Sequence, residues 1–219
     1  MYSSITKKVI MSLMGLFLIT FLLVHLSLNL TLIISSSKDT FNLAAHFMGT
    51  NPVVKVLEVV LFGGFIIHIF WGIVLFFQNW AARPHSYAVW NHSQETFFSK
   101  YMIHTGALIL AFLAIHLLDF WYKSRFSGGM PITQIDGIKY DDMGQLVLDK
   151  FKSPAYCSLY VIFLIFMGFH LDHAFQSALQ SLGINHSKYT PFFKKFSRFL
   201  AVVITIGYIS IPIVIYFIL

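Results

Sequence analysis

Residues 9–34 read VIMSLMGLFLITFLLVHLSLNLTLII, and His25 carries the only ionisable side chain in this run. No water reaches the backbone in the hydrocarbon core of a bilayer, so a spanning segment is a helix of about 20 residues or more. The run therefore predicts a membrane-spanning helix. Lys7 and Lys8 before it resemble the start of a secretory signal, but the run is longer than a signal core, so we expect the helix to be retained.

Four further segments have the same length and character. Pro52 and Pro154 stand where proline suits the first turn of a helix, and Gly183 is a natural stop. Hydrophobic residues make up 57% of the 219 residues and charged residues only 11%, against about a quarter charged in a soluble domain. We predict an all-α membrane protein with a single domain over residues 1–219. Its bundle of five transmembrane helices covers about 9–34, 53–79, 100–123, 154–182 and 197–217.

The connections between these segments are too short to hold a soluble domain. Residues 35–51 and 80–99 read as polar loops. In the longest connection, residues 126–153, apolar side chains recur at helical spacing, which predicts a short amphipathic helix on the membrane surface. The apolar residues of this predicted helix are Met143, Leu146, Val147 and Phe151.

The formal net charge is +6. The chain has no basic face with interleaved aromatic residues of the kind that binds nucleic acid, and its basic residues gather at helix ends, where they meet lipid head groups. Eight basic residues fall on the N-terminal side and seven on the other, and we expect the N-terminus in the bacterial cytoplasm. The N-terminal set is Lys7, Lys8, Arg83, Lys100, Lys188, Lys194, Lys195 and Arg198.

The chain has ten histidines, and their positions point to chemistry inside the membrane. An ionisable side chain within a span is unfavourable and is a functional hypothesis by default. Four histidines instead fall in the connections, where a solvated polar residue is the simpler interpretation. These four are His46, His85, His92 and His186.

Two histidines lie at matching depth from the N-terminal side. His25 follows Lys8 by 17 residues, and His116 follows Lys100 by 16. At a rise of 1.5 Å per residue, both lie about 24–26 Å into the membrane. The two helices run in the same direction, so they predict one pair.

A second pair lies at matching depth from the opposite side. His68 follows Pro52 by 16 residues, and His170 follows Pro154 by 16, which corresponds to about 24 Å. The two predicted layers are about 18–20 Å apart along the membrane normal. His173 competes with His170, because three residues on it shares much of the same helix face, but the matching depth favours His170.

Paired imidazoles at one depth are what a b-type haem requires, since the iron takes one nitrogen from each side of the ring. We therefore predict two bis-histidine haems, one held by His25 and His116 and one by His68 and His170. With both axial positions filled, electron transfer is the expected activity. The single Cys157 allows no disulfide and no thiolate metal site, and there is no Cys-x-x-Cys-His motif for covalent haem.

Small and polar residues accompany the four histidines. Gly15 and Gly106 precede His25 and His116 by ten residues each, or about 15 Å, which places them near the level of the other pair. They either make room for a porphyrin or serve ordinary helix packing. His104 and His173 lie towards the N-terminal-side surface and are candidates for contacts with haem propionates or a quinone. Asp172, beside them, is a candidate to support that site.

Around these histidines the chain resembles the single-subunit dihaem cytochrome b, of the b558 type, that belongs to succinate dehydrogenase and fumarate reductase. The resemblance covers nearly the whole chain. Its HLDHAFQSALQSLGINHSKYTP segment looks like the version found in Bacteroidetes-type members. The four matching pieces around the histidines are GLFLITFLLVH, NPVVKVLEVVLFGGFIIH, TGALILAFLAIH and LYVIFLIFMGFH.

The resemblance implies that His25 and His116 ligate the distal haem and that His68 and His170 ligate the proximal one. It also implies a flavoprotein and an iron–sulfur subunit on the cytoplasmic side, with electrons passing through the haems to menaquinone. Quinol-oxidising fumarate reductases of this family use a glutamate in or near the first outer connection, and SSSKDTFNLAAHFMGTN contains none. That difference favours succinate oxidation and leaves His46 as a quinone-site candidate.

Two other functions agree with the same residues. One is the dihaem cytochrome of a different quinone-linked oxidoreductase, such as the b subunit of a formate dehydrogenase or nitrate reductase, or a b561-type reductase. The other is a transporter without haem in which the histidines relay protons.

Overall fold

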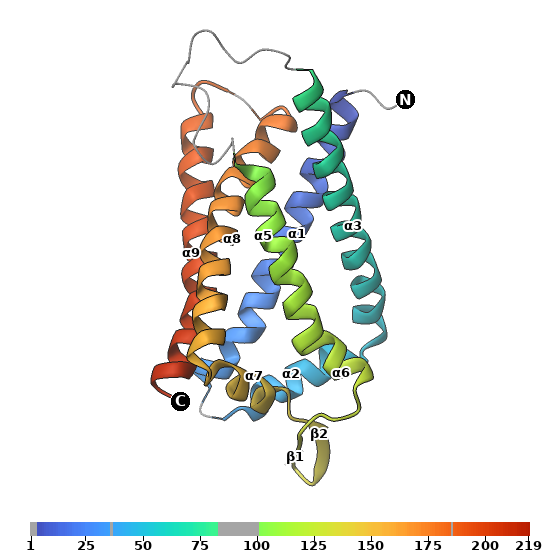
Figure 1. Ribbon diagram of the computed structural model, residues 1–219, viewed down its shortest axis with the longest axis vertical. Helices are drawn as coiled ribbons and strands as arrows, with labels where there is room; N and C mark the ends of the chain where they lie inside the picture. Colours follow the sequence, from blue (N-terminus) through green and yellow to red (C-terminus); the bar gives the residue numbers. More distant parts are fainter. Residues whose placement is uncertain (1–3, 36, 83–100, 185) are drawn as a thin grey trace.

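The computed structural model describes residues 4–35, 37–82, 101–184 and 186–219. The helices form an elongated bundle, and the two termini lie at its opposite ends (Figure 1). Five helices in the described residues are long and apolar enough to cross a membrane, so the predicted all-α bundle of a multi-pass membrane protein is confirmed. They are α1 (Ser4–Ile34), α3 (Pro52–Ala81), α5 with its continuations (Met102–Phe126), α8 (Pro154–Ser181) and α9 (Thr190–Phe217).

Side-chain caps and prolines define where two spans begin. The side chain of Asn51 accepts hydrogen bonds from the backbone of Val53 and Val54 at 2.9 and 3.3 Å, directly before Pro52. Ser153 caps α8 in the same way ahead of Pro154. These caps satisfy backbone N–H groups that have no partner within the helix.

Two spans begin earlier than hydropathy indicates. Helix α1 begins at Ser4 instead of residue 9, and α9 begins at Thr190 instead of residue 197. The first turns of both helices carry lysines, which a hydropathy profile reads as loop. A helix does not have to end where the hydrocarbon ends, so both continue into the head-group region.

The third span changes its winding part of the way down. Helix α5 (Met102–His116) passes into a π-helix, η1 (Leu117–Tyr122), and then into α6 (Lys123–Phe126). A π-helical turn widens the backbone and is frequent at functional sites. The sequence predicted a single helix over residues 100–123, because hydropathy does not report the local winding.

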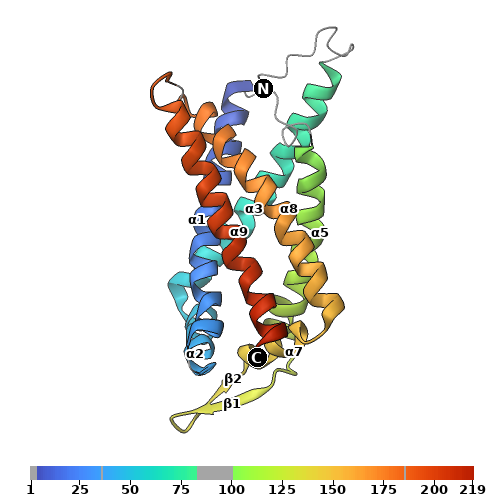
Figure 2. The ribbon, with the colours of Figure 1, turned by 90° about the vertical axis from the view of Figure 1, so that its left-hand side faces the viewer.

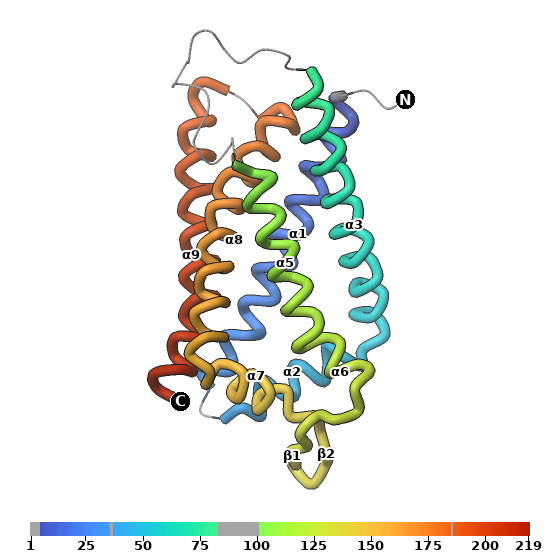
Figure 3. Tube along the Cα trace, viewed as in Figure 1, coloured from blue at the N-terminus to red at the C-terminus, as the bar shows by residue number. Residues whose placement is uncertain are grey.

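The predicted polar loop at residues 35–51 is wrong for most of its length. Residues Asp39–Thr50 form helix α2, which runs across the end of the bundle between α1 and α3 (Figure 3). The predicted surface helix in the longest connection is confirmed as α7 (Met143–Phe151). Both helices lie at the end opposite the N-terminus.

A hairpin that was not predicted precedes α7. Strands β1 (Ile132–Ile135) and β2 (Ile138–Asp141) pair antiparallel, with Ile135 opposite Ile138. Asp136 and Gly137, which join them, have φ angles of 50° and 81°. Asp-Gly is a preferred pair for a turn of this kind, so the sequence did contain the signal.

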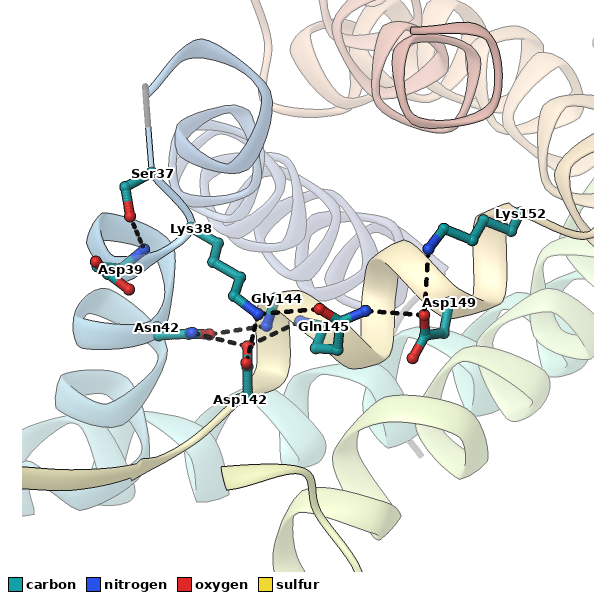
Figure 4. Close-up of polar contacts among 9 residues, drawn as sticks. All are labelled: Ser37, Lys38, Asp39, Asn42, Asp142, Gly144, Gln145, Asp149 and Lys152. Carbon is teal, nitrogen blue, oxygen red and sulfur yellow. Dashed lines mark hydrogen bonds and ion pairs between the residues drawn. The ribbon is translucent and has the colours of Figure 1, made fainter. Parts of the chain in front are cut away.

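A buried polar network connects α2 to α7 (Figure 4). Lys38 Nζ lies 2.6 Å from Asp142 Oδ2, and Asn42 Nδ2 donates to Asp142 Oδ1 at 2.9 Å. The backbone of Gly144 donates to Asn42 Oδ1 at 2.8 Å. Burial by itself raises the pKa of Asp142, but the hydrogen bonds from Lys38, Asn42 and the Gln145 backbone outweigh it, so the pKa lies below its ordinary value.

The tightest packing lies where α1, α8 and α9 meet (Figures 1 and 2). Ile204 and Ile215 of α9 are each 1% exposed. Tyr208 donates a hydrogen bond to the carbonyl of Leu22 in α1 at 2.8 Å. Helix α9 continues unbroken through Pro212.

Helices α3 and α5 have far fewer buried residues than α8 and α9. Gly64 is the buried residue of α3, and Thr105 is the buried residue of α5. A Cβ on Gly64 would lie 3.1 Å from the Phe17 ring of α1, so the two helices approach closely at this point. At the end opposite the N-terminus, α3 is held by Glu58, which accepts hydrogen bonds from Trp121 and from Arg125, the latter at 3.0 Å.

Candidate functional site: two histidine pairs

One histidine pair lies nearer the end opposite the N-terminus. His25 of α1 and His116 of α5 face each other with ring centroids 5.8 Å apart and planes at 89°. Both rings are half-buried, and aromatic side chains surround them. The neighbours within ring-contact distance are Phe21, Phe112, Phe120, Tyr160 and Tyr208.

The other pair lies nearer the N-terminal end. His68 of α3 and His170 of α8 have ring centroids 6.4 Å apart and planes at 69°. The structure thus brings together the same two couples that depth matching grouped. Each couple comes from two different helices.

The two glycines of the sequence analysis lie against the second pair. A Cβ on Gly15 would be 3.8 Å from the His68 ring, and a Cβ on Gly106 would be 3.6 Å from the His170 ring. Any larger residue at either position would approach an imidazole. The glycines therefore form a cradle at the level of this pair.

The same contacts relate the two levels of histidines to each other. Gly15 precedes His25 by ten residues in α1, and Gly106 precedes His116 by ten in α5. Ten residues correspond to about 15 Å along the helix axis, and the contacts of both glycines with the second pair agree with the level that the sequence assigned to them.

Two imidazole nitrogens in these pairs have no hydrogen-bond partner in the described part of the chain. They are Nδ1 of His68 and Nδ1 of His116, and both atoms are buried. A buried polar atom without a partner costs about 1–3 kcal/mol. Such atoms in native proteins point to a functional group or an ion at the site.

His170 differs, because Thr105 holds its ring. Thr105 Oγ1 lies 3.1 Å from His170 Nδ1 and also 3.0 Å from the carbonyl of Met102. When the hydroxyl donates its one proton to the Met102 carbonyl, Oγ1 accepts from Nδ1–H of His170. In that tautomer Nε2 of His170 is unprotonated, as a metal ligand requires. Thr105 was not predicted from the sequence, although a hydroxyl in an otherwise apolar helix was a signal for it.

A chain of polar side chains approaches the first pair from the surface helix α7. Lys150 pairs with Asp119 of η1, and Tyr156 donates to Asp119 at 2.8 Å. The hydroxyls of Tyr156 and Tyr160 are 2.8 Å apart, and the Tyr160 ring lies 6.5 Å from His116. This series of polar side chains therefore ends at the aromatic residues around His116.

The remaining candidates of the sequence analysis lie elsewhere. Asp172 accepts from Gln176 at 2.9 Å and lies 3.7 Å from Arg198, so it connects α8 to α9. His104 is exposed beside Tyr101. His173 is half-buried on α8, one turn beyond His170 towards the N-terminal end.

The structure describes two of the four histidines that were expected in the connections, His46 and His186. His46 was expected in a loop, but it lies on helix α2, where it is exposed and packs against Tyr140 of the hairpin at 5.0 Å. His186 is exposed before α9 and contacts Tyr189. His85 and His92 lie outside the described residues.

The donor set suits a metal that brings further ligands with it. Among residues 4–35, 37–82, 101–184 and 186–219, no three metal-ligating side chains come together. Two imidazoles alone match an iron whose other positions belong to a porphyrin. The ring centroids within each pair are 5.8 and 6.4 Å apart, so the two imidazoles of a pair, from two different helices, would hold such a group between them.

No protein-family model, curated protein or solved structure matches the chain. The fold and the site by themselves define a class, a multi-pass α-helical membrane protein with two facing histidine pairs at two depths.

Proposed function

We propose that this protein is a dihaem cytochrome b that carries electrons within a bacterial inner membrane. The observation that carries the proposal is the geometry of the two pairs. Four half-buried imidazoles face each other two by two, each couple spans two helices, and the couples lie on two levels.

Each residue then has a definite role. His25 and His116 hold one haem, and His68 and His170 hold the other. When bound, the two haems supply one-electron redox couples. Thr105 fixes the tautomer and orientation of His170, Gly15 and Gly106 keep space at the level of the second pair, and the aromatic residues around His116 exclude water.

We further propose that the chain is the membrane anchor of a succinate:quinone oxidoreductase, acting in succinate oxidation or, alternatively, in fumarate reduction. Its partners are a flavoprotein, which performs the dicarboxylate chemistry, and an iron–sulfur subunit, both on the cytoplasmic side with the N-terminus. Menaquinone is the electron acceptor. The support is the resemblance around the four histidines.

The first experiment is a visible spectrum with a haem-to-protein ratio, measured on the complex as isolated. The expected result is a reduced α-band in the b-type region and two haems per chain. No α-band in that region would contradict haem binding and favour a histidine-based transporter. The proteins that co-purify then test the partners, since a flavoprotein and an iron–sulfur subunit are expected together.

A further inference from the structure

The two ends of the bundle differ in how their charges are balanced. The end opposite the N-terminus holds seven basic and seven acidic residues. Four of the basic residues are paired with carboxylates there, in Lys38–Asp142, Arg125–Glu58, Lys150–Asp119 and Lys152–Asp149. At the N-terminal end, the described residues include six basic side chains and a single carboxylate, Asp172. The net positive charge of the described protein therefore lies at the N-terminal end.

Most of that charge gathers at the start of α9. Lys194, Lys195 and Arg198 are exposed and lie within two helical turns, and Lys188 is exposed just before them. Asp172 lies 3.7 Å from Arg198, whose side chain remains 70% exposed, so this pairing contributes little. The cluster is an exposed cationic surface, which we call the α9 basic surface.

Exposed aromatic residues occupy the same turns. Phe192, Phe196 and Phe199 are exposed, and the rings of Phe192 and Phe196 stack at 6.3 Å. Val203 and Ile206 lie on the same face of α9 as these phenylalanines. They are exposed in the spanning part of the helix. The stripe is therefore one lipid-facing surface that runs from the hydrocarbon to the head groups, and Lys195 lies on it.

We propose that the α9 basic surface binds the phosphate head groups of anionic phospholipids. Cations beside aromatic rings at the end of a span are the arrangement that meets an anionic leaflet. Lys195 lies on the phenylalanine stripe, so lipid that covers the stripe also meets Lys195. Positive charge with one carboxylate, Asp172, among the described residues of this end selects an anionic head group over a zwitterionic one. The proposal is independent of the haem assignment.

The test uses the full chain, purified in an uncharged detergent, and a short-chain phosphatidylglycerol as the probe, with the matching phosphatidylcholine for comparison. Native mass spectrometry measures the two dissociation constants. Phosphatidylglycerol should bind more tightly, and Lys194→Gln together with Lys195→Gln should weaken it by about fivefold for each cation removed. High salt should reduce the preference.

Two further variants keep the test decisive. Lys55→Gln with Lys139→Gln removes the same charge from exposed positions at the other end and should leave phosphatidylglycerol binding unchanged. Lys194→Arg with Lys195→Arg should restore it, which separates charge from folding. Equal binding of the two lipids, or an equal loss in the Lys55 and Lys139 control, would overturn the proposal. So would unchanged lipid binding with a loss of co-purifying protein, which would make the surface a protein interface.

Discussion

The half of the bundle formed by α8 and α9 and the half formed by α3 and α5 are stabilised differently. In the first, side chains such as Ile204 and Ile215 are almost fully buried. In the second, α3 buries Gly64 and α5 buries Thr105. These helices carry His68 and His116, whose buried Nδ1 atoms have no hydrogen-bond partner among the residues that the structure describes. Packing therefore stabilises one half, and a few specific contacts hold the other around the proposed site.

The largest expected effect concerns the two histidine pairs, to which the α3–α5 half contributes His68 and His116. Replacing His68 or His170 with Ala should remove one haem entirely, and replacing His25 or His116 should remove the other, because each iron loses one of its two protein ligands. The measurement is haem content per chain, with the reduced spectrum. If His170→Ala kept both haems while His173→Ala lost one, the assignment on α8 would be wrong.

The second effect tests the α8–α9 half. Ile204→Ala should destabilise the protein by about 2–4 kcal/mol, because it leaves a cavity in a closely packed interface. Ile206→Ala is the matched control on the same helix, since Ile206 faces lipid, and it should cost under about 1 kcal/mol. Unfolding in detergent measures both. Similar losses in the two variants would contradict the contrast between the halves.

A smaller effect concerns the polar network of Lys38, Asn42 and Asp142, which connects α2 to α7. The folded pKa of Asp142 lies below its ordinary value of 3.8, so its stabilisation is complete above that value and is lost as the pH falls towards the lower folded pKa. At neutral pH, Asp142→Asn should lower the free energy of unfolding by about 1–3 kcal/mol. The reason is that it weakens the charged hydrogen bonds to Lys38 and Asn42. Unfolding followed from pH 6 to pH 3 should show a steeper acid loss in the wild type than in the variant.

The Asp142→Asn variant also tests which part of the molecule loses stability. Because α2 connects α1 to α3, hydrogen exchange should rise in α2, in α7 and in the first turns of α3, whereas the middle of α9 should stay protected. Uniform loss of protection would show that the two halves do not open separately.

The smallest effect concerns the ligand environment of His170. Thr105→Val keeps the shape of the side chain but removes the hydroxyl, and it should cost about 0.5–1.5 kcal/mol. Loss of this hydrogen bond lowers the basicity of the imidazole, so the reduction potential of that haem should rise by roughly a few tens of millivolts. A redox titration measures it, and Thr105→Ser should stay near the wild type. An unchanged potential in Thr105→Val would remove the positioning role.

Much of the architecture could be predicted from hydropathy and counting. A run such as residues 9–34 cannot be placed in water, and its length matches a bilayer, so the spans and their alternating direction were accessible. Counting 1.5 Å per residue also grouped His25 with His116 and His68 with His170. Helix α2 was missed because it is short and partly polar, and such a segment becomes helical only where it packs against α7 and α3.

What the sequence by itself determined is membrane residence, the number of spans and the depth of each histidine, because these depend only on apolar length and on the constant rise of a helix. Only the tertiary structure decided that the imidazoles of each pair face each other, that Thr105 contacts His170, and that basic residues at one end are paired with carboxylates. Those properties depend on rotation and tilt of one helix against another, which are set by close contacts such as Gly64 with Phe17 and not by any segment alone.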